Sequence, residues 1–244
     1  MADDQGAGSA GDTPDASTVA LFQSAWRTYR KIVENNYLFH REAYSALHRF
    51  LVEDVDRPFH FLDLACGDAS ASARALQGTK IVHYHGIDFS AEALKLAGVT
   101  LAGLGCPVTL EERDFVAAIG DLQRPVDVAW IGLSLHHLRQ PEKRVFMARM
   151  RSLLGDYGRL LIYEPASPDD EDRARWLKRW DALEPTYTAC TKEEWDSVSA
   201  HVHAADFPEM DSTWRRLGRE TGFGTMCELF RAPTDLLRLY CLMP

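Results

Sequence analysis

Three aspartates stand at the ends of short apolar runs, where a parallel sheet would bring their carboxylates to one edge. Asp63 lies in the first run, Asp88 ends the second, and Asp114 follows the third. An acid at the end of a second strand can accept both hydroxyls of a ribose, which is the role predicted for Asp88. Asp114 stands beside Phe115, and an acceptor next to a ring suits adenine, whose amino group donates while its ring stacks.

The turn after the first run predicts a ligand loop. A strand, a turn of small residues around Gly67 and then a helix bring backbone N–H groups and the positive helix end close to a ligand. A nicotinamide dinucleotide would require a GxGxxG pattern, and residues 65–70 offer one glycine. Asp68 would also repel a pyrophosphate. The loop therefore favours a ligand that carries no phosphate.

Two adjacent histidines, His136 and His137, follow the apolar run 126–133. Histidine titrates near neutral pH, so one of them can act as a general base or orient an acceptor. Two adjacent rings at such a junction are expected to face different ways, so the hypothesis assigns catalysis to one of the pair. The alternative, that both are structural and bond to backbone, stays open.

No metal site is predicted. His83 and His85 alternate with apolar residues and are interpreted as structural. His201, His203 and Asp206 form a possible ligand set in a different segment, which is kept only as an alternative.

Strands and helices alternate after residue 58, which indicates βαβ units and a parallel sheet covered on both faces. A tight turn at 232–234 predicts that the last two strands are antiparallel, and the turn 155–158 separates a helix from the fifth strand. The predicted fold class is α/β, a doubly wound, mostly parallel seven-stranded sheet with an antiparallel C-terminal hairpin. The predicted strands are 59–65, 81–87, 107–112, 126–133, 159–164, 223–230 and 236–242, and the predicted helices are 71–77, 91–104, 115–121, 141–154 and 214–222.

The remaining segments are predicted to flank this sheet within one domain, 18–244. Residues 1–17 are small and polar, which predicts a disordered tail. Residues 18–56 follow a helical period and are interpreted as a helical cover made of one long helix or two shorter ones. Residues 165–208 break the alternation and are interpreted as a helical insertion that forms a lid, with large rings at Trp176, Trp180, Tyr187 and Trp195. A structural helix pair that packs on the last helix is the alternative for this segment.

Taken together, these motifs resemble the class I S-adenosylmethionine-dependent methyltransferases. The resemblance covers about residues 59–165, and the closing hairpin fits the seven-stranded sheet of that family. The family's loop usually carries glycines where this chain has Ala65 and Ala69, so only Gly67 follows the pattern. The resemblance implies methyl transfer from S-adenosylmethionine to a small molecule, and a cofactor without phosphate tolerates Asp68.

The resemblance also implies a set of cofactor-binding residues. Tyr37, Arg41, Tyr44 and His48 are expected on one face of a covering helix, with Arg41 on the methionine carboxylate and Tyr37 near the sulfonium or the substrate. Glu164 is expected near the substrate pocket. The full cofactor-binding set is Tyr37, Arg41, Asp63, Ala65, Gly67, Asp88, Phe89, Asp114, Phe115, Leu133 and Ser134.

Composition narrows the partners and the setting. The net charge of -9 opposes nucleic acid, and no apolar run reaches the length of a membrane span. Five scattered cysteines without a CxxC pair indicate a reduced, cytoplasmic setting. Two other functions stay open, a methyltransferase acting on protein or RNA and a non-catalytic protein with the same fold, and so does the oligomeric state.

Overall fold

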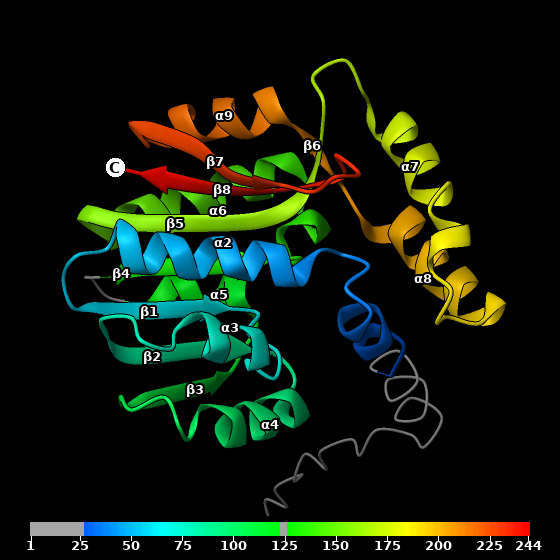
Figure 1. Cartoon of the computed structure of the whole chain (residues 1–244). Coiled ribbons are helices and arrows are strands. Elements are labelled where there is room, and N and C mark those ends of the chain that lie inside the picture. The colour runs from blue at the N-terminus through cyan, green and yellow to red at the C-terminus, as the bar shows by residue number, and fades with distance from the viewer. Residues whose placement is uncertain (1–26, 123–125) are drawn as a thin grey trace, which may run out of the picture.

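A sheet of seven strands runs through the computed structural model, which describes residues 27–122 and 126–244 (Figure 1). The strand order is β3-β2-β1-β4-β5-β8-β7, and a short β6 pairs with the end of β5. The predicted tail, 1–17, and the start of the predicted cover lie outside the described residues. The strands are β1 (Phe59–Leu64), β2 (Ile81–Asp88), β3 (Val108–Glu112), β4 (Val126–Gly132), β5 (Leu154–Ser167), β6 (Glu209–Met210), β7 (Thr225–Arg231) and β8 (Leu237–Met243).

The predicted fold class is confirmed. β1 to β5 pair in parallel, whereas β8 runs antiparallel to both β5 and β7. The central strands are short apolar runs because both of their faces are covered. The carboxyl ends of β1, β2, β3 and β4 therefore meet at one edge of the sheet, where open α/β folds bind ligands.

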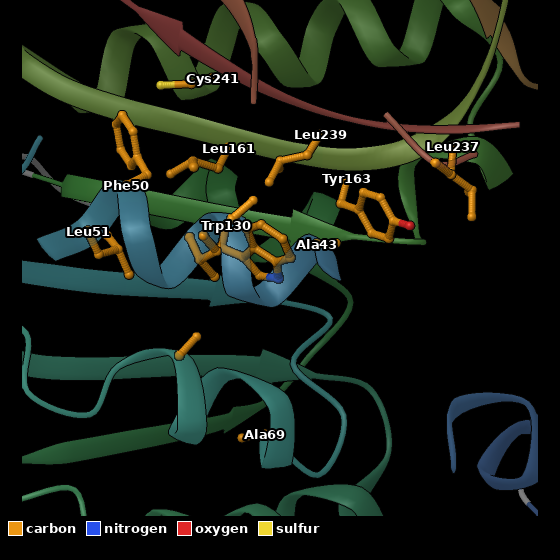
Figure 2. Close-up of a cluster of buried hydrophobic side chains, with 14 of the residues drawn as sticks. Ala43, Phe50, Leu51, Ala69, Trp130, Leu161, Tyr163, Leu237, Leu239 and Cys241 are labelled. Carbon is orange, nitrogen blue, oxygen red and sulfur yellow. The ribbon is translucent and has the colours of Figure 1, made fainter. Parts of the chain in front are cut away.

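Helices cover the sheet in two layers. One core joins the sheet to α2 (His40–Glu53), α3 (Ser70–Ala75) and α4 (Ala91–Leu101). The other core joins it to α5 (Phe115–Asp121), α6 (Gln140–Leu153) and α9 (Asp211–Glu220). Figure 2 shows the rings of Trp130 and Tyr163 in the layer between the sheet and α2. Among the described residues, no helix has the length and apolar character needed to cross a membrane.

The covering segment consists of two helices, one of the two arrangements expected, whereas the predicted turn at 155–158 is wrong. Residues 27–34 are helical, but the chain turns at 35–38 before α2 begins, with Asn36 and Phe39 in the left-handed region (φ 59° and 51°). The predicted turn 155–158 lies inside β5, where the register with β4 jumps from Val126↔Leu154 to Val128↔Arg159. A bulge thus absorbs these residues without ending the strand.

The insertion lies beyond the carboxyl ends of the parallel strands (Figure 1). It consists of α7 (Arg173–Asp181), a single turn η2 (Glu184–Thr186) and α8 (Lys192–Ala205). Trp180 stacks between Trp176 and Trp195, with ring centroids 6.1 and 5.5 Å away, and Tyr187 meets Trp195 edge-on at 4.8 Å. All four rings are buried, so they form the insertion's own core.

Residue 86 of β2 is so closely surrounded by other side chains that we expect only glycine to fit there. A Cβ there would lie 2.8 Å from Tyr84 Cε1, 2.9 Å from Leu110 Cδ2 and 3.0 Å from Cys66 Sγ. Gly86→Ala should lower the free energy of unfolding by about 1–3 kcal/mol, measured by urea denaturation, because overpacking forces the neighbours to move.

Gly98→Ala is the matched control. Its Cβ would meet only Leu110 Cδ1, at 3.8 Å, from the middle of α4. This variant should gain about 0.5–1 kcal/mol, because alanine has the higher helix propensity. Equal effects of the two substitutions would contradict the close approach.

Candidate functional site

The loop between β1 and α3 is held in an unusual backbone conformation. Ala65, Gly67 and Ala69 all lie in the left-handed region, with φ of 54°, 55° and 54°. Each non-glycine residue there costs roughly 1–2 kcal/mol, and such strain gathers at ligand sites. The two alanines thus adopt a left-handed backbone conformation that glycine would adopt without strain.

Asp88 ties this loop to the second strand. One of its carboxylate oxygens accepts from the Gly67 N–H at 2.8 Å, and the other accepts from the Ser90 N–H at 2.9 Å. A carboxylate offers about four lone-pair sites, so two stay available for a ligand. Phe89 follows with 69% of its surface exposed, a large ring open to solvent at the same edge.

Asp63 lies beneath the loop. Tyr84 donates its hydroxyl to Asp63 Oδ2 at 2.6 Å, and the carboxyl group is only 1% exposed. Burial raises the pKa of Asp63 to about 6, against the lowering effect of hydrogen bonds from Ser72 and Tyr84. Asp63 therefore supports the loop from inside the sheet.

Asp114 and Phe115 separate in the structure. Asp114 is exposed and caps α5 by accepting from the Ala117 N–H at 2.9 Å. Phe115 packs edge-on against Phe146 of α6, with ring centroids 5.8 Å apart. The carboxylate is thus open to a ligand, whereas the ring belongs partly to the core.

The covering segment contributes differently from the prediction. Tyr37 lies in the turn before α2, stacks on Tyr187 at 4.3 Å and accepts from the Ala189 N–H at 2.8 Å. Arg41 is exposed and lines a surface depression with Arg49. The expected common face is therefore wrong, because the chain breaks between the two positions.

Two further residues of the expected face serve packing. Tyr44 accepts a hydrogen bond from Trp130 Nε1 at 3.2 Å, and His48 Nδ1 lies 2.8 Å from the Ala75 carbonyl oxygen. Both bonds join α2 to the elements that it covers.

A buried carboxylate organises the end of β4. Glu164 is fully buried, and its Oε1 accepts from the N–H groups of Ser134 and Leu135, both at 2.8 Å. Its Oε2 accepts from the backbone N–H of His136 at 3.2 Å and lies 2.7 Å from the Nδ1 of the same residue. The single turn η1 (Leu135–His137) is thus closed by one side chain of β5. Leu133, just before it, takes a left-handed conformation (φ 54°).

The two histidines face the same way, contrary to the prediction, because the turn of η1 brings both rings to Asp206. His136 Nε2 lies 3.7 Å and His137 Nδ1 3.6 Å from Asp206 Oδ1, and the ring centroids are 4.1 Å apart. Burial lowers the pKa of His137 to about 4, with a further contribution from His136. For His136, burial is outweighed by the Glu164 and Asp206 carboxylates, and its pKa is raised.

The other histidines divide into two groups. His201 lies next to His137, with ring centroids 5.3 Å apart, whereas His203 turns away to Asp181 Oδ1 at 2.8 Å. The alternative ligand set of His201, His203 and Asp206 is therefore not brought together. His83 and His85 bond to side chains of β3, Thr109 and Glu111, as structural residues would.

A cavity of about 600 Å³ opens between the carboxyl ends of the strands, the covering segment and the insertion. Its wall is mostly apolar and aromatic, and His136, His137, His201 and Asp206 gather at one part of it. Residues that shape the wall include Tyr29, Ile32, Tyr37, Leu38, Leu133, Pro165, Trp176, Trp180, Leu183, Val198 and Leu237.

Sequence reasoning missed the site roles of Tyr29 and Tyr84. Burial, together with the nearby carboxylates of Asp68 and Asp88, raises the pKa of Tyr29 to about 12, so the helix 27–34 lies close to the loop. In the sequence, Tyr29 is one aromatic residue of a helical pattern and Tyr84 one of an alternating strand pattern. Neither pattern shows which carboxylate the tyrosine lies next to in the folded chain.

Comparison with known proteins shows which sequences and folds this chain resembles. Residues 61–158 match the family described as a methyltransferase domain, whereas no curated protein matches the sequence. A proposed O-methyltransferase from Nostoc punctiforme has a TM-score of 0.57 at 12% identity over 81% of this chain, which spans only 55% of that protein. Magnesium protoporphyrin IX methyltransferase from Synechocystis, with bound SAH, has a TM-score of 0.61 at 16% identity over 92% of this chain and 95% of its own. The DhpI–SAH complex has a TM-score of 0.58 at 14% identity over 92% and 94%. At these identities the likeness shows the fold.

The raised pKa of Asp63 predicts a pH dependence of stability. A carboxyl whose pKa rises from 3.8 to about 6 on folding favours the folded state when protonated. Its contribution is therefore lost as pH rises from about 4 to about 6, by about 2–3 kcal/mol. Asp63→Asn should lose less stability than the parent across this range in urea unfolding. Parallel curves for the two proteins would contradict the assignment.

Proposed function

We propose that this chain is a class I S-adenosylmethionine-dependent methyltransferase and that it methylates a small molecule held in the cavity beneath α7 and α8. The observation that carries the proposal is that cavity, about 600 Å³, at the carboxyl ends of the strands. Its lining residue Tyr29 interacts electrostatically with Asp68 of the loop 65–69 and with Asp88. A volume of this size suits one small ligand. The insertion, 165–208, then acts as the lid over it.

We propose that the loop and the acids beside it hold the cofactor. Asp88 would accept the two ribose hydroxyls with its free lone pairs, and the exposed Phe89 and Asp114 lie where the adenine would rest. When bound, S-adenosylmethionine supplies a methyl group on a sulfonium sulfur. Leu133 lines the cavity and follows β4, and we propose that it lies near that methyl group. Arg41 lines a separate surface depression with Arg49, so it is not part of this cavity wall.

The cavity wall favours a largely apolar acceptor, because most of its lining is aliphatic or aromatic. Trp176 and Trp180 form part of it, and within the described part of the chain the buried indole N–H of Trp180 has no hydrogen-bond partner. An acceptor oxygen or nitrogen would satisfy this donor. The solved structures that resemble the chain include a methyltransferase of magnesium protoporphyrin IX, which supports a small-molecule acceptor.

We propose that the histidine pair forms the polar end of the acceptor site. His136 is held by Glu164, whereas the His137 side chain is 43% exposed and borders the cavity. A nucleophile placed there would be oriented for in-line attack on the methyl group of the sulfonium. Its proton would pass to one of the two histidines. Positioning of this kind supplies much of the acceleration in a two-reactant transfer.

Two other functions are less well supported. A macromolecular acceptor would need an open groove, whereas here the helix 27–34 and the insertion cover the cavity. The acidic net charge opposes RNA in particular. A non-catalytic role is opposed by the strained loop, which a purely structural sheet does not need.

We propose a cytoplasmic setting for the protein. All five cysteines are free, as thiols are in a reducing compartment.

Cofactor binding through Asp88 is the first test. Asp88→Ala should weaken S-adenosylmethionine binding by about 2–4 kcal/mol, roughly 30- to 1000-fold, because a charge-assisted acceptor of two hydroxyls is lost. Isothermal titration calorimetry measures the change, with circular dichroism to verify folding.

Glu112→Ala is its control. Glu112 is the register partner of Asp88 at the exposed end of β3, so its loss should leave the affinity within about threefold. An Asp88→Ala variant that folds and binds as the parent does would remove the central part of the proposal.

Turnover tests the histidine pair. His136→Ala and His137→Ala should be compared by the conversion of labelled S-adenosylmethionine with an acceptor found by methylating a small-molecule extract. At least one should lose about a hundredfold in rate with cofactor affinity unchanged, within the usual range for a proton-transfer residue. His203 of α8 is bound to Asp181 of α7, so His203→Ala should keep full activity. Rates within fivefold of the parent for both variants would exclude the pair.

A further inference from the structure

Three side chains from two distant segments converge at the polar end of the cavity. His136 and His137 come from η1, and Asp206 ends α8 almost seventy residues later. One possible ligand atom from each lies within 4.8 Å of the other two. We propose that these three residues bind one divalent transition-metal ion, of the Zn²⁺ class, at the wall of the acceptor cavity.

The separations suit ligands of one ion better than hydrogen bonds. Asp206 Oδ1 lies 3.7 Å from His136 Nε2 and 3.6 Å from His137 Nδ1, and a contact of 3.6 Å is too long for a hydrogen bond. A tetrahedral ion with bonds of about 2.0–2.1 Å separates its ligand atoms by roughly 3.3–3.5 Å. Small side-chain rotations would therefore complete the site.

Asp206 supplies an independent observation. Its side chain is only 5% exposed, and its Oδ1 is buried without a hydrogen-bond partner among the described residues. An unsatisfied buried carboxylate oxygen costs several kcal/mol unless a cation or a donor meets it. The atom points at the two imidazoles, so a shared cation would satisfy it.

Glu164 prepares His136 for this role. Its contact with Nδ1, 2.7 Å, keeps the proton on that nitrogen and leaves the lone pair on Nε2, the atom nearest Asp206. A carboxylate behind a ligating histidine is the usual support of a protein zinc ligand. The second histidine must change its partner to ligate: its Nδ1 lies 3.4 Å from the Ala205 carbonyl oxygen, which only accepts, so this long hydrogen bond is released before Nδ1 can bind an ion.

The buried charges near the site leave room for a cation. Lys143 pairs with Glu209 at 2.9 Å and donates to the Phe207 carbonyl oxygen. Arg173 donates to the backbone carbonyl oxygen of Asp206 at 2.7 Å, not to its carboxylate. Among the described residues, the histidines are the only cationic partners within 4.0 Å of the Glu164 and Asp206 carboxylates, whereas Lys143 and Arg173 act on them from farther away.

The donor set selects the kind of metal. Two imidazole nitrogens and one carboxylate oxygen suit Zn²⁺, Fe²⁺ or Co²⁺, whereas Mg²⁺ and Ca²⁺ prefer oxygen ligands alone. Three protein ligands leave at least one position open towards the cavity. If the proposed function holds, an acceptor hydroxyl bound at that position would lose its proton more easily, so the site would favour an oxygen nucleophile.

Titration of the chelator-treated protein with Co²⁺, without cofactor or acceptor, tests the site. We expect one ion per chain, a visible absorption band of four- or five-coordinate Co²⁺, and displacement by Zn²⁺. His137→Ala and Asp206→Asn should each lower the affinity at least about 100-fold. His203→Ala should leave it unchanged, because that ring is bound to Asp181.

Binding that is absent in the parent, or unchanged in both variants, would overturn the proposal. In that case a proton on His136 supplies the positive charge between the two carboxylates. His137 is half exposed, so its variant is expected to fold even if the Asp206 variant does not. Calorimetry with SAH is run in parallel: Co²⁺ binding without SAH binding would reject the proposed function and keep the metal site.

Discussion

The carboxylate of Glu164 is the group on which the arrangement of the acceptor end depends. It accepts three backbone N–H groups of residues 134–136 and contacts the His136 ring, so four of its lone-pair sites are used. Burying a carboxylate is unfavourable unless such bonds replace water. Its neighbours depend on it in turn, because each N–H left unpaired would cost about 1–3 kcal/mol. Glu164 of β5 therefore determines the orientation of the turn that carries both histidines.

The cofactor end follows the same principle with a different acid. Asp88 closes the loop 65–69 onto β2 by accepting the Gly67 N–H, and Asp63 supports it from below through Tyr84. The strained alanines at 65 and 69 persist because these bonds and the buried strands on either side determine the backbone. Both ends of the site are thus shaped before any ligand arrives, which reduces the ordering that binding requires.

The sequence predicted a doubly wound, mostly parallel sheet and its antiparallel C-terminal hairpin. Both could be predicted because apolar runs and turns are local signals that repeat along the chain. It also placed the acids at the ligand edge, because the order of strands and helices carries that information. The direction of the histidines was wrong, since the pitch of a three-residue turn held by Glu164 has no local signature. Likewise, the break at 35–39 separates Tyr37 from Arg41, and nothing in the helical spacing of Tyr37 and Tyr44 announces it. Asp206 approaches both rings only through the path of the insertion.

That path links the insertion to the chemistry. The stacked rings of Trp176, Trp180 and Trp195 hold α7 against α8, and the Phe207 N–H donates to the His136 carbonyl oxygen at 2.7 Å just after α8 ends. Asp206 is thereby held beside the histidines by two features. The hydrogen bond of Phe207 follows it in the chain, and the aromatic core of the insertion precedes it. The same two tryptophans, 176 and 180, also form the cavity wall. A movement of the insertion away from the strands would therefore carry Asp206 away from the histidines, so that, under the proposed function, access to the cavity and the assembly of its polar end would be coupled.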